Sequence, residues 1–193
     1  GAVPPKAHAT QVRGIIGAGS DDGVGITGVA PQAHLLALRA CWPGHGTDTE
    51  AVCSSFTLAK ALQFVLDSHV QVLNLSLTGP RDPLLARLLD VATAQRVVVV
   101  AAVDARSPGG GFPASHRDVM AVTGEDGPRI PPAAVLAPDH GIPATTIGGG
   151  WTLVSGTSYA AAQVSGLVAA LRGLGPKGTP DQVRAALAPA GVG

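Results

Sequence analysis

Hydrophobic residues along this chain alternate between helical and strand-like spacing. Three segments carry apolar residues at helical spacing: residues 8–18, Glu50–Ser68 and Pro83–Gln95. Five short apolar runs are typical of buried strands: His34–Ala40, Val70–Leu77, Arg96–Val103, Asp118–Thr123 and Pro132–Ala137. A mostly apolar helix is expected at Tyr159–Leu171, and a last helix at Pro180–Leu187, where Thr179 would be the N-cap. The pattern therefore predicts strands that alternate with helices.

This order of elements predicts the fold class. Strands alternating with helices form α/β folds, in which right-handed crossovers build a parallel sheet. We expect a three-layer α/β/α fold with a mostly parallel sheet, and a single domain over residues 1–193, because no stretch resembles a linker. Ligands of such sheets bind beyond the carboxyl ends of the strands. The segments to examine for function are therefore Ser76–Gly79, Asp104–Gly111 and Pro138–Gly150.

Val154–Gly166, with the sequence VSGTSYAAAQVSG, places small hydroxyl and glycine residues directly before the apolar helix. Such hydroxyls are typical N-caps, so we expect Ser158 in the first helical turn. Free backbone N–H groups and the positive end of the helix dipole gather there. A nucleophilic hydroxyl at this place would have donors for an oxyanion beside it. A well-capped buried helix without catalytic function is the alternative interpretation.

Composition and charge exclude several classes of partner. Thirteen basic residues balance thirteen acidic ones, which argues against nucleic acid or an anionic membrane. No apolar run approaches the roughly 18 residues of a transmembrane helix. The glycines of GIIGAG at residues 14–19 follow a predicted helix rather than a strand, unlike a dinucleotide-binding motif, and no cofactor is expected. Metal-ligand spacing is absent among the histidines and carboxylates, so we expect no metal.

The two cysteines, Cys41 and Cys53, flank a loop in the first third of the chain. A disulfide that closed this loop would contribute about 3 kcal/mol. Two free buried thiols are the alternative, and the pair is too sparse for a zinc site.

Four motifs, taken in order, resemble those of the subtilisin-like serine peptidases (subtilases). HATQVRG at His8–Gly14 is similar to the family's histidine motif, and VLNLSLTG at Val72–Gly79 to its substrate-edge motif. VVAAVD at Val99–Asp104, followed by GFPAS at Gly111–Ser115, is similar to its oxyanion segment. SGTSYAAAQVSG is close to its serine motif. The resemblance covers nearly the whole chain and implies a subtilisin-like fold.

The resemblance also implies a role for each matching residue. Ser158 would attack a peptide carbonyl, and His8 would take its proton and return it to the leaving amine. Asp104 stands at the oxyanion position. Two short segments would bind an extended peptide or protein substrate. They are Ser76, Leu77 and Thr78 at the cleft edge, and Ala101, Ala102 and Val103 along the pocket for the residue before the cleaved bond.

The family's catalytic Asp has no counterpart before His8. An imidazole without its carboxylate loses on the order of 10⁴-fold in rate. Two explanations remain open: an N-terminal segment or second chain supplies the missing strand and its Asp, or the protein is a pseudoprotease or peptide-binding module with the subtilase shell. Asp48, Asp67 or Asp139 could stand in for the carboxylate, although the spacing supports none of them.

Two further departures concern the substrate cleft. Asp104 replaces an oxyanion Asn, and a carboxylate repels an oxyanion unless burial keeps it protonated. Thr78 and Val103 replace glycines that shape the family's pocket, so we expect a preference for small residues before the cleaved bond. We expect a secreted, periplasmic or cell-envelope location, although this sequence shows no signal peptide.

Overall fold

A four-stranded parallel sheet forms the centre of the protein. The computed structural model describes residues 5–20, 25–44, 51–175 and 182. The sheet has the order β3 (Val72–Leu75), β4 (Val98–Ala102), β5 (Met120–Gly124) and β6 (Val135–Ala137), each strand parallel to its neighbour. All five residues of β4 and of β5 are buried, which explains why β4 is a continuous apolar run and why β5 has only one polar side chain, that of Thr123, instead of an alternating pattern.

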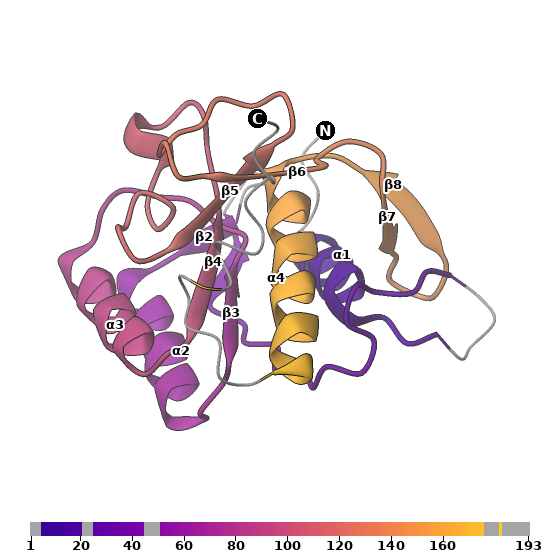
Figure 1. Ribbon diagram of the computed structural model, residues 1–193, viewed down its shortest axis with the longest axis horizontal. Coiled ribbons are helices and arrows are strands. Elements are labelled where there is room, and N and C mark those ends of the chain that lie inside the picture. Colours follow the sequence, from indigo (N-terminus) through magenta and orange to yellow (C-terminus); the bar gives the residue numbers. More distant parts are fainter. Residues whose placement is uncertain (1–4, 21–24, 45–50, 176–181, 183–193) are drawn as a thin grey trace.

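Helices cover both faces of this sheet (Figure 1). The helices α2 (Ser55–Asp67) and α3 (Pro83–Ala94) pack on one face, where Leu62, Leu89 and Val99 share a core. The long helix α4 (Thr157–Leu174) packs on the other face, and α1 (Pro5–Gly17) lies against α4. The predicted three-layer α/β/α fold with a parallel sheet is confirmed.

The region before α2 differs from the prediction. The helix was expected from Glu50, but it begins at Ser55, where the Ser54 side chain accepts a hydrogen bond from the backbone N–H of Thr57. The three residues before this cap form β2 (Ala51–Cys53), which pairs in antiparallel fashion with β1 (Cys41–Pro43). A disulfide joins Cys41 to Cys53. The cross-strand pairing and the disulfide prevent the helix from extending further toward the N-terminus.

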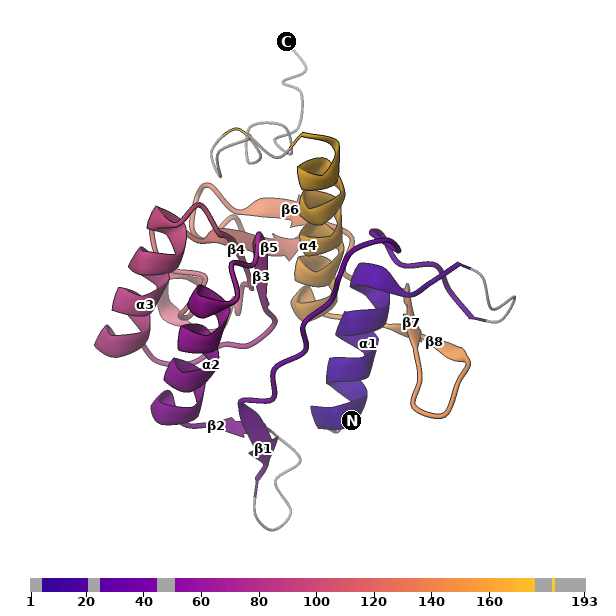
Figure 2. The same ribbon diagram turned by 90° about the horizontal axis from the view of Figure 1, so that it is seen from below.

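The predicted buried strand at His34–Ala40 is wrong. These residues form no strand, and the side chains of Leu36 and Leu38 are 51% and 39% exposed. Figure 2 shows the segment running alone past α1 toward β1. An apolar run becomes a buried strand only when a neighbour pairs with it, and none of the described residues does so here.

An antiparallel hairpin before α4 was not predicted. It consists of β7 (Ile142–Thr145) and β8 (Trp151–Val154), with Ile142, Ala144 and Val154 turned inward. A short 3-10 helix, η1 (Pro108–Gly110), interrupts the loop after β4. The predicted final helix at Pro180–Leu187 lies, apart from residue 182, outside the described residues.

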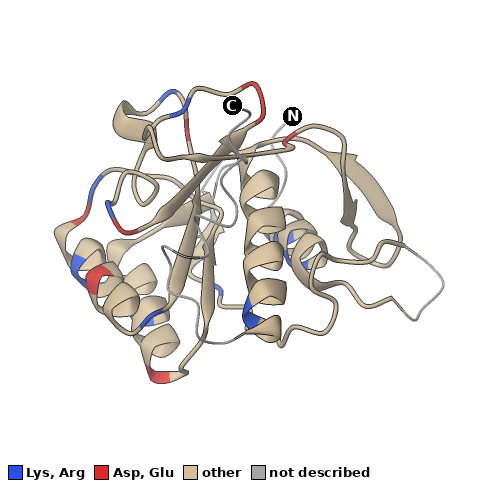
Figure 3. Cartoon of the chain, in the orientation of Figure 1, with Lys and Arg blue, Asp and Glu red and all other residues tan. Residues whose placement is uncertain are grey.

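Charged side chains are sparse and mixed in sign over the described part of the chain (Figure 3). The hairpin and nearly all of α4 carry none, since the first charged residue after His140 is Arg172. Within the described residues, no helix is both long and apolar enough to span a bilayer.

Candidate active site

Ser158 is the second residue of α4, as the sequence predicted, but no hydroxyl caps the helix. The N-cap is Gly156, whose φ of 138° is a conformation that residues with a side chain rarely adopt. The hydroxyl of Thr157 donates instead to the carbonyl of Val103, at 2.8 Å. The Gly156 N–H donates to the carbonyl of Asp139, at 2.7 Å. The turn before Ser158 is therefore fixed by the ends of two strands, β4 and β6.

The end of a third strand, β3, reaches the same turn. The Ser76 hydroxyl donates to the carbonyl of Ser158 at 2.8 Å. Asn74 donates from Nδ2 to the Ser76 oxygen at 3.0 Å, and its Oδ1 accepts from the Ser165 hydroxyl at 2.9 Å. Two of the segments predicted from the strand order thus reach the turn around Ser158 through Ser76 and Asp139, and Val103, which reaches it too, directly precedes the third. The contribution of Ser165 was missed, because only the tertiary fold brings it to Asn74.

His8 lies in the first half of α1 and faces α4. Its ring centroid is 5.5 Å from that of Tyr159, the residue after Ser158. Burial lowers the pKa of His8 from its ordinary value, because the charged imidazolium loses water. The imidazole is therefore in the neutral form that a general base requires at neutral pH.

No carboxylate among the described residues is paired with His8. Asp67 accepts a hydrogen bond from Gln63 on α2, and Asp139 is bonded to His140 at 2.8 Å. Asp48, the third candidate, lies outside the described residues. The described part of the chain thus holds a base near the serine without an orienting acid.

Asp104 is turned back into its own loop. Its Oδ1 accepts from the backbone N–H and from Nε of Arg106, at 3.0 and 3.1 Å, and its Oδ2 accepts from the Ser107 hydroxyl at 3.0 Å. The hydrogen bond from the backbone of Arg106 is the main cause that holds the pKa of Asp104 below its usual range. The idea that burial keeps this carboxyl protonated is therefore wrong, because the bonds all favour the ionised form.

A single groove of about 2450 Å³ connects these residues. Its lining includes His8, Asp104 and Ser158, and also the predicted substrate residues Ser76, Leu77, Thr78, Ala102 and Val103. Ala101 is fully buried in the core under α2 and α3, so its side chain does not reach the groove. The groove continues between residues 34–40 and β3, along the edge of the sheet.

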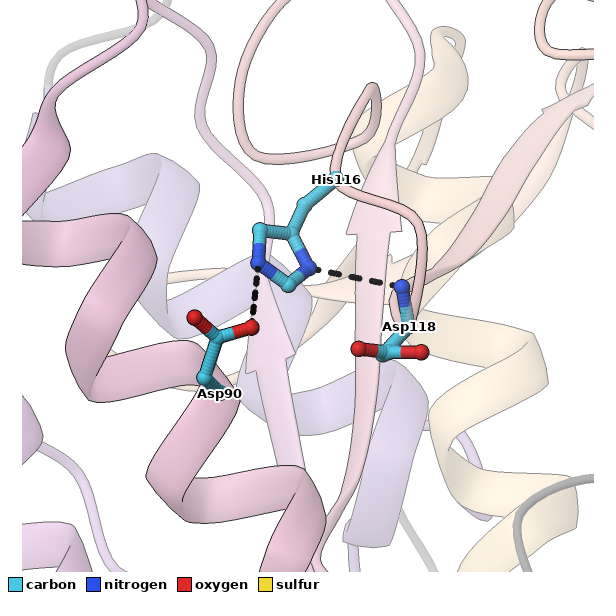
Figure 4. Close-up of side chains that lie close together, drawn as sticks. All are labelled: Asp90, His116 and Asp118. Atoms are coloured by element: carbon cyan, nitrogen blue, oxygen red, sulfur yellow. Dashed lines mark hydrogen bonds and ion pairs between the residues drawn. The ribbon is translucent and has the colours of Figure 1, made fainter.

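A second polar cluster lies away from this groove, between α3 and the loop before β5 (Figure 4). Its ligand atoms, from Asp90, His116 and Asp118, lie within 4.8 Å of one another, a spacing that could admit a metal ion. The bonding opposes one. His116 Nδ1 accepts the backbone N–H of Asp118 at 3.3 Å, so the ring proton is on Nε2, which faces Asp90 Oδ1 at 3.3 Å. Arg117 already contacts both carboxylates, at 3.4 and 2.9 Å.

Sequence and structure comparisons agree on the kind of protein that this chain resembles. The sequence profile of the Subtilase family matches residues 3–190. The alkaline elastase YaB of Bacillus sp. (strain YaB) is 29% identical over 189 residues, covering 93% of this chain and 48% of that protein. A thermophilic serine proteinase of Bacillus sp. (strain AK1) is 34% identical over 179 residues, covering 87% of this chain and 43% of that protein. The chain thus spans about half the length of the curated relatives it matches.

The fold comparison gives the same result. The solved structure of sphericase superposes with a TM-score of 0.80 at 23% identity, covering 96% of this chain and 69% of that one. The arrangement of sheet and helices is therefore shared with that protein, independently of close sequence similarity.

Proposed function

This chain belongs to the subtilase family, and on that premise we propose that it carries the site of a serine endopeptidase, with Ser158 as the nucleophile and His8 as the general base. One observation carries the proposal: Ser158 lies at a helix N-terminus in the same groove as a half-buried imidazole whose pKa is lowered by burial. A curated relative that is named as a serine proteinase supports the same class of reaction.

The proposed reaction proceeds through an acyl-enzyme. Ser158 Oγ attacks the carbonyl carbon of the substrate, and its proton passes to His8. The backbone N–H of Ser158 is one of the first four of α4, which have no acceptor inside the helix, and would donate to the oxyanion. When the C–N bond breaks, His8 returns the proton to the leaving amine. Water then releases the acid by the same steps, with His8 again as the base.

The substrate would bind in extended form along residues 76–78, which follow β3 at the groove edge. Thr78 narrows this place, since its hydroxyl lies where a side chain at Gly111 would begin. Val103 also lines the groove, although it is 2% exposed and packs in the core under α2 and α3. Because each of these side chains takes more space than a glycine would at the same position, we expect a preference for a small residue before the cleaved bond.

We further propose that a strand from an N-terminal segment or a second chain fills the gap between residues 34–40 and β3 and brings a carboxylate to His8. Three observations support it. β3 is an edge of the described sheet, Leu36 and Leu38 are exposed beside it, and the groove is larger than the roughly 300–1,000 Å³ of a small-molecule site. An added strand would pair the free edge and cover these leucines.

A peptide-binding module without peptidase activity is the second candidate. The state of Asp104 favours it, because an ionised side chain that only accepts hydrogen bonds gives an oxyanion no donor. Such a module would hold extended peptides in the groove without cleaving them.

A fluorophosphonate probe, which reacts with activated serines, distinguishes the two candidates. We expect the protein to be labelled, and labelling to be lost in Ser158→Ala and strongly reduced in His8→Ala. Ser155→Ala is the matched control, because Ser155 is an exposed serine of the same turn. A β-forming peptide that contains one Asp should raise the labelling rate, and the same peptide with Asn should not. Peptide binding without labelling under both conditions would favour the module.

The Cys41–Cys53 disulfide supports a location outside the cytoplasm, since disulfides persist in oxidising compartments.

A further inference from the structure

Two buried polar side chains between α1 and α4 have no part in the proposed reaction. Gln11 and Tyr159 are 7% and 4% exposed. The Tyr159 hydroxyl donates to Gln11 Oε1 at 2.7 Å. Buried polar groups are costly unless they are paired, so each of these residues requires the other.

The positions of the two residues relate this bond to the base and the nucleophile. Gln11 is three residues after His8 on α1, so both side chains lie on the same helix face. Tyr159 directly follows Ser158 on α4, and its ring contacts the His8 ring at 5.5 Å between centroids, with the ring planes tilted by 50°. The hydrogen bond thus joins the helix of the base to the helix of the nucleophile.

Other contacts hold the rest of α1 but do not reach the imidazole. The Thr145 hydroxyl on β7 donates to the Thr10 carbonyl at 3.0 Å. A side chain at Gly166 on α4 would begin 3.3 Å from the Ile16 carbonyl, so the two helices touch closely at that end. Among the described residues, no side chain is hydrogen-bonded to His8. The Tyr159 ring is thus a direct side-chain contact of the His8 ring that comes from the helix of the nucleophile.

We propose that Tyr159, oriented by Gln11, is a positioning residue that holds the His8 imidazole in place beside Ser158. The inference rests on the proposed function and deepens it. In this site the Tyr159 ring does part of what an orienting carboxylate does for a catalytic histidine, because it limits the ring to one orientation. Misplacement of a catalytic group by about 1 Å can cost roughly 10²-fold in rate, so the bond to Gln11 matters although it touches no substrate.

The surroundings of His8 make its titration a clean reporter of this contact. The elements that pack on α1 are α4, β7 and β1. Of these, α4 has one charged residue, Arg172, near its far end, and β7 and β1 have none. On α1 itself, Lys6 and Arg13 are exposed. A change in the pKa of His8 on altering Tyr159 would therefore report the loss of ring cover and not of a neighbouring charge.

The test uses three alterations of the full chain and one control. Tyr159→Phe keeps the aromatic ring and removes the hydrogen bond to Gln11, whereas Tyr159→Leu removes the ring as well. The double variant, Gln11→Met with Tyr159→Phe, replaces both partners of the hydrogen bond by apolar groups of similar shape. Thr145→Val is the matched control, because it removes a different hydrogen bond to α1 and leaves the contact between the Tyr159 and His8 rings unchanged. Two quantities are measured: the pKa of His8, from the NMR titration of its ring protons, and the rate of fluorophosphonate labelling at pH 8.

We expect Tyr159→Leu to raise the pKa of His8 toward its ordinary value of about 6.5 and to slow labelling by about tenfold or more. At pH 8 the imidazole is neutral in every variant, so a slower rate reports position and not protonation. Tyr159→Phe should slow labelling several-fold with little change in the pKa. The double variant should regain thermal stability relative to Tyr159→Phe, because no polar group is left unpaired, and labelling should stay slow.

In a protein that is labelled at Ser158, four outcomes overturn the positioning role alone. They are recovery of labelling together with stability in the double variant, an equal loss of labelling in Thr145→Val, an unchanged His8 pKa in Tyr159→Leu, and full labelling of Tyr159→Phe. Absence of Ser158 labelling in the unaltered protein overturns the proposed function, and the positioning role with it.

Discussion

Replacing Asp104 by Asn should speed the reaction of Ser158, because it converts an acceptor at the oxyanion position into a donor. Val103, the preceding residue, is bonded through its carbonyl to Thr157, so position 104 is held next to the nucleophile turn. The carboxylate accepts three hydrogen bonds from Arg106 and Ser107 and has no proton to give. A negative oxyanion near it is therefore repelled, and the nearby Arg106 guanidinium offsets this only in part because it is 90% exposed.

The expected gain follows from what one oxyanion donor contributes. A single side-chain donor accounts for about 10²–10³ in turnover, or about 2.7–4 kcal/mol. The new amide must share its groups with Arg106 and Ser107, so we expect about a 10- to 100-fold increase, which at most reaches the lower limit of what one full donor gives. The lost ion pair is at the surface, where such pairs contribute about 0–1 kcal/mol, so the melting temperature should change little.

The assay is the second-order rate constant for fluorophosphonate labelling, or for release of a chromogenic group from a peptide, in matched preparations. Asp104→Ala is the control, since it removes the charge without adding a donor. The expected order of rates is Asn fastest, then Ala, then the unaltered protein. An Asn variant no faster than the unaltered protein would refute the reasoning, and equal rates for Asn and Ala would show that only the charge matters.

Further predictions concern pH, the disulfide and substrate size. Because burial lowers the pKa of His8, the labelling rate should rise with pH through a midpoint below about 6.5; a midpoint above that value would contradict the buried base. The same lowered pKa makes the folding stability depend on pH: the contribution of the neutral imidazole is complete above about pH 6.5 and is lost as the pH falls through the folded pKa. The urea midpoint of the unaltered protein should therefore be lower at pH 5 than at pH 7. In His8→Phe the two midpoints should differ less. Replacing both Cys41 and Cys53 by Ser should lower the unfolding free energy, measured in urea, by about 3 kcal/mol. If a reductant destabilised this variant as much as the unaltered protein, the effect of the reductant would not come from the disulfide. Peptides with Ala before the cleaved bond should react faster than those with Phe, and Thr78→Gly should reduce the difference; faster cleavage after Phe by the unaltered protein would refute the narrow pocket.

Several features of the fold could be predicted from local sequence because local forces decide them. Arg96–Val103 was identified as a strand from its β-branched run, and Val98–Ala102 is one. α3 begins at Pro83, after Asp82, whose carboxylate accepts the backbone N–H groups of Leu84 and Leu85. The position of Ser158 at the start of α4 likewise follows from the change between a glycine-rich turn and a helix-forming run.

Other features depended on neighbours that a local pattern does not contain. The apolar run at residues 34–40 has the composition of a buried strand, yet without a described partner for its backbone it stays unpaired and exposed. Asp104 could be placed at the oxyanion position from its motif, but its hydrogen bonds, and so its ionised state, come from the way its loop folds back.

The order of the elements, the class of fold and the family motifs around Ser158 and His8 can be predicted from the amino-acid sequence, because helical and strand periodicity and a specific motif are properties of consecutive residues. The groups that surround these two residues depend on the tertiary structure: Ser165 donates to Asn74, Tyr159 donates to Gln11, and the Tyr159 ring lies against the His8 ring. The physical reason is that burial and hydrogen bonding are satisfied between segments far apart in the chain, and a periodic pattern specifies which face must be covered but not what covers it.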